Sequence, residues 1–282
     1  MRRIAHISDL HFGRVDPVVA AALLADLDES RPDLVIVSGD LTMGARRSEF
    51  RAAADFLARI AAPWIAVPGN HDISPYRLVQ RFTDPFRRWR RYIHPITEPD
   101  WHDEEIAVVG LNSARAMALE LDWSQGRLGK DQIRRVEERF AGLASGAFRI
   151  VVAHHPFLPP EFAPDTRVVG RADEALSCFQ SLGVGLTLAG HLHRGYARIL
   201  APVIDAAGEL TDLAPRPPER AASRDLLVVQ AGSAISTRLR DEPNAYHRIR
   251  IEDGIAAVEA RLWTGDGWAS AEEAGAAAVA VP

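Results

Sequence analysis

Aspartate, asparagine and histidine side chains follow five apolar segments of the sequence, each at the point where the segment ends. The clearest case is the run 34–37, which leads through Ser38 and Gly39 to Asp40. A run this apolar is typical of a strand that is buried on both faces. A carboxylate at the end of such a strand is costly unless a positive charge meets it, and the carboxyl ends of strands in open α/β sheets are where ligands bind. We therefore interpret Asp40 as a site residue.

The other four apolar segments, 4–8, 64–67, 150–153 and 186–189, end in donors of the same kind. Together with Asp40 they give seven candidate metal ligands: Asp9, His11, Asp40, Asn70, His154, His191 and His193. These side chains are ligands of hard to borderline divalent metals. Seven donors are too many for one tetrahedral ion, but they suit two ions that share Asp40 as a bridge. Such pairs, roughly 3.5–4 Å apart, clamp the attacking and leaving oxygens of a phosphoryl displacement.

The order of these motifs resembles that of the calcineurin-like metallophosphoesterases. The matching motifs are Asp-x-His at 9–11, Gly-Asp at 39–40, Gly-Asn-His-Asp at 69–72, a His before x-Pro at 154–156 and Gly-His-x-His at 190–193. The resemblance spans residues 1 to about 253, and no motif position departs from it. It implies an α/β fold, a four-layer α/β/β/α sandwich of two mixed sheets, with a dinuclear metal site at the strand ends. It also implies one ion held by Asp9, His11, Asp40 and His193, and a second held by Asp40, Asn70, His154 and His191.

The same resemblance leaves His71 without a metal and directs it at the substrate. There it can protonate the leaving oxygen or stabilise charge on the phosphoryl group. We expect Asp72 to fix the tautomer of the His71 imidazole, as carboxylates do for catalytic histidines. A turn or helix-cap role is the alternative for Asp72. We expect His155 to support the ligands rather than bind metal, and His6 to belong to the core.

The two ions, for which Mn, Fe, Zn, Ni or Co are all chemically suitable, imply attack by a metal-bridging hydroxide on phosphorus. Within the superfamily, the opening motif, the His-His-Pro at 154–156 and the stretch 232–238 resemble bacterial class III cyclic-nucleotide phosphodiesterases. The expected substrate is thus a small anionic phosphodiester, with a 3',5'-cyclic nucleotide as one candidate. The chief alternative is a nucleotide-sugar or lipid-linked pyrophosphatase or phosphodiesterase. A non-catalytic scaffold is disfavoured, because such a protein is expected to have lost several ligands.

Composition excludes several other classes of protein. A length of 282 residues fits one large domain or two small ones, and 47% hydrophobic and 25% charged residues are ordinary for a globular chain. The net charge of −5 gives no strong nucleic-acid or anionic-membrane signal. Cys178 is the single cysteine, so an internal disulfide is excluded. We find no signal peptide and no apolar run near the ~20 residues of a membrane span, which makes the cytoplasm the expected location.

Apolar segments that alternate with helical patterns predict parallel βαβ units. We expect a helix over 17–30 capped by Asp16, and a second helix that Ser48 caps and Pro63 ends. Two further helices are expected around 133–143 and 172–182, with a strand at 106–111. Later strands are expected at 196–203, 226–232, 245–251 and 256–263, the last three antiparallel, with a proline-rich connection at 215–218. We expect one domain over 1–268 and a mobile, Ala-rich tail over 269–282.

Residues 74–92 interrupt this alternation and carry six arginines against one acid, Asp84, a local net charge of +5. The arginines are Arg77, Arg81, Arg87, Arg88, Arg90 and Arg91, interleaved with Phe82, Phe86, Trp89 and Tyr92. One interpretation is a solvated helical face over an aromatic inner stripe. A second is a basic wall for an anionic substrate, because the segment follows the 69–72 motif directly. A nucleic-acid groove is the third, and a run this short on an acidic protein supports it weakly.

Overall fold

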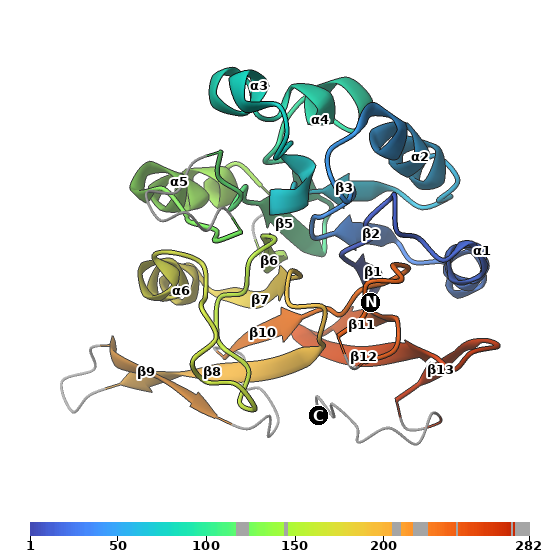
Figure 1. Cartoon of the computed structure of the whole chain (residues 1–282). Coiled ribbons are helices and arrows are strands. Elements are labelled where there is room, and N and C mark those ends of the chain that lie inside the picture. Colours follow the sequence, from blue (N-terminus) through green and yellow to red (C-terminus); the bar gives the residue numbers. More distant parts are fainter. Residues whose placement is uncertain are drawn as a thin grey trace.

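The computed structural model describes residues 1–116, 124–143, 146–204, 210–216, 225–240, 242–271 and 273. Two sheets pack face to face, with helices on their outer faces (Figure 1). Among the described residues, the first sheet has the strand order β13-β12-β11-β1-β2-β3 and the second β4-β5-β6-β7-β10-β8-β9. The four-layer α/β/β/α sandwich that the motifs imply is therefore confirmed.

The first sheet contains β1 (Arg2–Ile7), β2 (Leu34–Val37), β3 (Trp64–Ala66), β11 (Ala245–Glu252), β12 (Ile255–Trp263) and β13 (Trp268–Ser270). The second sheet contains β4 (Asp100–His102), β5 (Ile106–Gly110), β6 (Phe148–Val152), β7 (Val184–Ala189), β8 (Tyr196–Ile204), β9 (Leu210–Arg216) and β10 (Leu226–Gln230). Strands β1 to β3 pair in parallel, and so do β5, β6, β7 and β10. Because parallel neighbours end at the same edge of a sheet, the motif loops of each sheet lie side by side.

Helices α1 (Pro17–Ser30) and α2 (Arg47–Leu57) pack on the first sheet, and α5 (Lys130–Ala141) and α6 (Ala172–Ser181) on the second. The short helices η1 (Asn70–Asp72), α3 (Leu78–Thr83) and α4 (Arg87–Tyr92) follow β3. As predicted, Asp16 caps α1: its Oδ1 accepts hydrogen bonds from the backbone N–H groups of Val18 (2.9 Å) and Val19 (3.4 Å). No helix among the described residues is long and apolar enough to cross a membrane.

Apolar side chains from both sheets interlock between them, which explains why the central strands are apolar on both faces. Ile36 of β2 and Val152 of β6 are among the fully buried members of this inter-sheet core. A second core lies between the first sheet and α1 and α2, and a third between the second sheet and α5 and α6. Each central strand is thus buried on both sides and mainly apolar; a few polar residues inside strands, such as His6 in β1 and Thr187 in β7, are buried, and the motif residues follow the strand ends.

Three details of the sequence-based expectation are wrong. Helix α2 is not capped by Ser48, because the Glu49 carboxylate accepts the N–H groups of Gly44 (2.9 Å) and Arg46 (3.0 Å) that precede the helix. Pro215 lies in strand β9 rather than in an irregular connection, whereas Pro217 and Pro218 lie outside the described residues. Strand β10 joins the second sheet, parallel to β7, and does not pair with β11. Strand β13 ends at Ser270 and most of the predicted tail lies outside the described residues, so the predicted domain boundary stays a prediction.

Candidate metal centre

All seven predicted ligands meet where the loops after β1, β2, β3, β6 and β7 converge. One group contains Asp9, His11 and His193, with His193 Nε2 3.3 Å from Asp9 Oδ1 and 3.0 Å from His11 Nε2. A second group contains Asp40, Asn70, His154 and His191. In it, His154 Nε2 lies 3.3 Å from Asp40 Oδ2 and 3.2 Å from Asn70 Oδ1. The structure therefore brings together residues that are up to 184 positions apart in the sequence, from Asp9 to His193.

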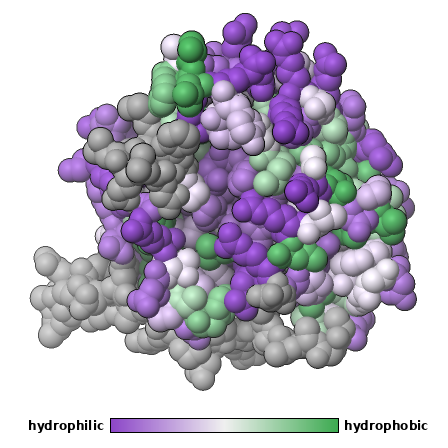
Figure 2. Space-filling model, in the orientation of Figure 1, coloured by the Kyte–Doolittle hydropathy of each residue, from purple (hydrophilic) through white to green (hydrophobic). Residues whose placement is uncertain are grey.

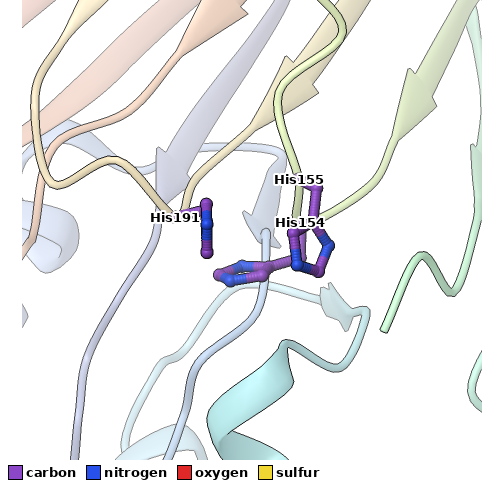
Figure 3. Close-up of side chains that lie close together, drawn as sticks. All are labelled: His154, His155 and His191. Carbon is purple, nitrogen blue, oxygen red and sulfur yellow. The ribbon is translucent and has the colours of Figure 1, made fainter. Parts of the chain in front are cut away.

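Asp40 lies between the two groups, and Asn70 joins the members of the second. His11 Nε2 is 3.8 Å from Asp40 Oδ2, the oxygen that His154 also approaches. His191 Nδ1 is 3.1 Å from Asn70 Oδ1. Figure 3 shows His154 and His191 close together on the loops that follow β6 and β7. The position of Asp40 fits the bridging role that the sequence predicts for it.

Hydrogen bonds outside the cluster fix how two histidines face it. His154 Nδ1 donates to the carbonyl oxygen of Ser38 (2.7 Å), and His193 Nδ1 donates to that of Arg238 (2.9 Å). A carbonyl can only accept, so each neutral ring presents the lone pair of Nε2 to the cluster. For His154 that lone pair faces a carboxylate oxygen and an amide oxygen, which are acceptors too. A metal ion bound to this lone pair and to the two oxygens would take the place of the proton that Asp40 otherwise attracts to Nε2, so these residues fit a divalent metal.

Buried charge gives a second test of this fit. Asp9 Oδ1 is buried and has no hydrogen-bond donor among the described residues, an arrangement that is costly without a cation. Burial by itself lowers the pKa of His154. The charge of Asp40 and a hydrogen bond to it, the charge of Asp9 and the hydrogen bond to the Ser38 carbonyl outweigh burial and raise that pKa to about 9. The carboxylates thus attract positive charge to the centre of the cluster. Burial and His154 lower the pKa of His191 to about 4, so this ring is neutral at pH 7, as a metal ligand must be.

The ligand loops are strained, as expected where function overrides local preference. Asp9, His11, Asp40, His191 and His193 all have positive φ, between 48° and 80°. Non-glycine residues adopt this conformation rarely and at a cost, and it is typical of functional sites. Gly39, at φ +98°, precedes Asp40, and a Cβ there would lie 2.6 Å from His154 Nδ1. The tight turn after β2 therefore needs glycine for both its conformation and its space.

His71 lies beside the cluster. Its backbone N–H donates to Asp40 Oδ1 (2.8 Å), and its ring centroid is 4.9 Å from that of His11. Its Nδ1 donates to the carbonyl oxygen of Met43 (2.7 Å), while Nε2 lies 2.9 Å from Arg238 Nη1. A guanidinium can only donate, so Nε2 accepts and the ring is neutral. Met43 and Arg238 were not among the predicted site residues.

The expectation that Asp72 fixes the His71 tautomer is wrong, because the Met43 carbonyl does so. The Asp72 carboxylate instead accepts the backbone N–H groups of Leu41 (3.2 Å), Thr42 (2.9 Å) and Gly69 (3.0 Å), as well as the Thr42 hydroxyl. Burial and the charge of Asp40 raise the pKa of Asp72 to about 7, although these hydrogen bonds oppose the shift. Asp72 thereby ties the loop after β3 to the loop after β2, which is the turn role named as its alternative.

His155 and His6 make the supporting contacts that were expected of them. His155 Nε2 donates to the Ser124 carbonyl (2.8 Å), and Nδ1 lies 2.8 Å from Ser113 Oγ, so both ring nitrogens are engaged. His155 also appears in Figure 3 beside His154. Ser113 was missed, although it follows the apolar strand β5 just as the motif residues follow theirs. His6 is buried between the sheets, where its Nε2 lies 2.8 Å from Ser38 Oγ.

The basic segment 74–92 is only partly the solvated face described above. Arg81 and Arg88 are buried, and they donate hydrogen bonds to the backbone carbonyls of Ala116 (2.7 Å) and Ala45, respectively. Trp89 is fully buried and Phe86 and Tyr92 pack on the same core, but Phe82 is exposed. Tyr76, Leu78 and Val79 are exposed as well, and Figure 2 shows a hydrophobic group among hydrophilic residues at the top of the molecule, over α3.

The fold and the converging Asp, Asn and His side chains define a phosphoesterase of the metal-dependent class. Residues 2–195 match the family model of the calcineurin-like phosphoesterases, and the chain belongs to this family.

Named relatives and solved structures agree with this assignment. A probable cyclic nucleotide phosphodiesterase of Synechococcus sp. is 28% identical over 211 residues, which cover 68% of this chain and 74% of that protein. A glycerophosphodiester phosphodiesterase of Enterobacter lignolyticus is 36% identical over 80 residues, 24% of this chain and 29% of that protein. A purple acid phosphatase from yellow lupin has a TM-score of 0.67 at 13% identity. The superposition covers 95% of this chain and 52% of that phosphatase. A dimetal phosphatase from Danio rerio has a TM-score of 0.61 at 13% identity, with coverages of 93% and 96%. At this identity the two structures show the fold alone.

Proposed function

We propose that this protein is a phosphodiesterase that hydrolyses a small anionic phosphodiester at a site for two divalent ions, with Mn, Fe, Zn, Ni or Co as suitable metals. One observation carries the proposal. Asp40 Oδ2 and Asn70 Oδ1 both lie within 3.3 Å of His154 Nε2, in a cluster where Asp9 Oδ1 is buried without a hydrogen-bond donor among the described residues. Divalent cations bound among these side chains would compensate the buried charges of Asp9 and Asp40.

Each ligand group would hold one ion. Asp9, His11 and His193 would complete one position and Asn70, His154 and His191 the other, with Asp40 shared between them. When bound, the two ions would act as Lewis acids on the phosphoryl oxygens and lower the pKa of water towards neutrality. The Ser38 and Arg238 carbonyls support this assignment, because they hold His154 and His193 in the tautomer that a metal requires.

His71 is the proposed substrate-facing residue of the chain. The Met43 carbonyl keeps a proton on Nδ1, so Nε2 is the nitrogen that is left for chemistry. As a general acid, His71 would take up a second proton at Nε2 and pass it to the leaving oxygen. Alternatively, it would stabilise charge on the phosphoryl group by hydrogen bonding.

A 3',5'-cyclic nucleotide is the substrate that we favour. The support is the sequence similarity to a protein named a probable cyclic nucleotide phosphodiesterase, which extends over 211 residues. A nucleotide-sugar or lipid-linked substrate is the second candidate. It is favoured by the exposed Tyr76, Leu78, Val79 and Phe82, which would suit an amphiphilic anion near the exposed Arg77 and Arg87.

The test is an activity panel on the metal-loaded protein. Cyclic nucleotides, bis-aryl phosphodiesters, phosphomonoesters and nucleotide-sugars are compared at equal concentration, with the metal content measured on the same samples. We expect about two ions per chain and faster hydrolysis of diesters than of monoesters. A well-loaded sample that holds no more than one ion, or that cleaves no diester, would contradict the proposal.

Substitution of His71 by Ala separates its role from that of the ligands. We expect both ions to be retained, because His71 belongs to neither ligand group. Loss of a proton donor typically costs ~10²–10⁴-fold in rate. The loss should be large for a cyclic nucleotide, whose alkoxide leaving group needs a proton, and smaller for a nitrophenyl diester. Equal losses on both would favour charge stabilisation, and loss of metal would show a structural role.

A further inference from the structure

A loop outside the five sequence motifs completes the wall of the metal centre. Residues 231–240 follow β10 and cross from the second sheet to the end of β1. Ser233 Oγ donates to the Asp9 carbonyl (2.8 Å), and Ala234 N–H donates to the Ser8 carbonyl (3.0 Å). The loop is therefore fixed against the backbone of the first ligand, Asp9.

Arg238, in this loop, contacts the site through both its backbone and its side chain. Its carbonyl oxygen accepts the Nδ1–H of His193 (2.9 Å), a proposed ligand. Its guanidinium Nη1 donates to His71 Nε2 (2.9 Å), the nitrogen that faces the substrate in the proposed function. The backbone N–H of Arg238 is held in turn by Ser236 Oγ (3.0 Å). The guanidinium thus lies one hydrogen bond from His71, whose ring contacts that of His11.

The charge of Arg238 has no counter-ion in the part of the chain that the structure describes. By contrast, Arg194, near the same loop, pairs with Glu242 at 3.0 Å. The one side-chain hydrogen bond of Arg238 to a described residue goes to a neutral imidazole, which does not compensate a positive charge. A guanidinium has five N–H donors in a planar fork, so donors remain for an anion beside His71.

We propose that the Arg238 guanidinium binds a non-bridging oxygen of the substrate phosphoryl group, next to His71. This inference rests on the proposed function and adds a substrate-binding residue to it. Arginine suits the role because its fork matches phosphate oxygens and keeps its charge at all relevant pH values. In the absence of substrate, the hydrogen bond to His71 Nε2 holds the guanidinium at the site. A phosphoryl oxygen that accepts from Arg238 also leaves Nε2 free for the leaving group.

The test is binding of inorganic phosphate to the metal-loaded Arg238→Met variant, measured by calorimetry and by competitive inhibition. Methionine removes the guanidinium but keeps the backbone carbonyl that holds His193. We expect metal content and thermal midpoint to match the wild type, and phosphate affinity to fall by about 10- to 100-fold, as expected for hydrogen bonds to a charged group. Arg238→Lys should recover part of the affinity, because it keeps the charge but loses the fork.

Arg240→Met is the matched control, because Arg240 is an exposed arginine two residues further along the same loop. It should bind phosphate as the wild type does. Unchanged phosphate affinity in Arg238→Met would overturn the proposal. Loss of metal in that variant would overturn it too, because it would show that Arg238 acts by supporting His193. Phosphate binding is measured without turnover, so a wild type that binds phosphate but cleaves no diester would contradict the proposed function and leave the role of Arg238 testable.

Discussion

Replacement of Gly69 by Ala should disable the metal centre by steric contact alone. Gly69 has φ −104° and ψ −178°, an extended conformation that alanine adopts without strain. A Cβ at this position would nevertheless lie 2.1 Å from Asp40 Oδ1 and 2.5 Å from the Asp40 backbone nitrogen. Contacts of a real Cβ are rarely shorter than 3.0 Å, so the Asp40 carboxylate or the Gly69 loop must move by about 1 Å.

The size of the effect follows from the part that Asp40 plays. A displacement of about 1 Å in a catalytic geometry can cost ~10²-fold in rate. Because Asp40 is proposed to bridge both ions, their affinities should fall together. Overpacking of a buried contact typically costs about 1–3 kcal/mol of stability, so the variant should still fold. We expect a folded protein with reduced metal content and a turnover number lower by about two orders of magnitude.

The assay combines metal analysis after loading and dialysis, kcat on a diester, and the thermal midpoint. Gly142→Ala is the matched control, because a Cβ at Gly142, at the end of α5, would meet no atom closer than 3.7 Å. That variant should keep wild-type metal content and turnover. Wild-type metal affinity and turnover in Gly69→Ala would refute the reasoning, since they would show that contact with residue 69 does not constrain Asp40.

Three further predictions concern the ligands, the core and the basic segment. Asp40→Asn should lower the occupancy of both metal positions in metal analysis, and near-normal turnover would contradict the bridging assignment. Burial lowers the pKa of His247 from 6.5 to about 4, so the unfolded chain binds a proton that the folded chain does not. The free energy of unfolding should therefore fall as the pH drops from about 6.5 to 4, and His247 should account for up to about 3 kcal/mol of that fall. In denaturation experiments, the free energy of unfolding of His247→Asn should depend less on pH. Joint replacement of Arg77 and Arg87, which line a groove of about 650 Å³, by Gln should raise KM for an anionic substrate and flatten its salt dependence. Kinetics of that double variant that match the wild type at every salt concentration would remove the basic segment from the substrate path.

The sequence by itself determined the central strands and the residues that converge at the candidate metal centre. Strand Leu34–Val37 is buried on both faces, so it is an unbroken apolar run, and the first charged residue, Asp40, follows its end. Parallel pairing then carries Asp9, Asp40 and Asn70 to one edge of the first sheet. These signals are local, and they do not depend on which distant segment packs against them.

Only the tertiary structure decided the hydrogen-bond partners around those residues. Asp72 and His71 are adjacent, which favoured a direct contact, yet the turn directs the carboxylate to backbone N–H groups of the loop after β2 and the ring to Met43. Arg238 is 167 residues from His71 and reaches it because β10 lies beside β7 and its loop crosses to β1. The composition of the basic segment likewise did not reveal that Arg88 is buried. Strand order and loop crossings arise from the packing of distant segments, and no local pattern of residues encodes them.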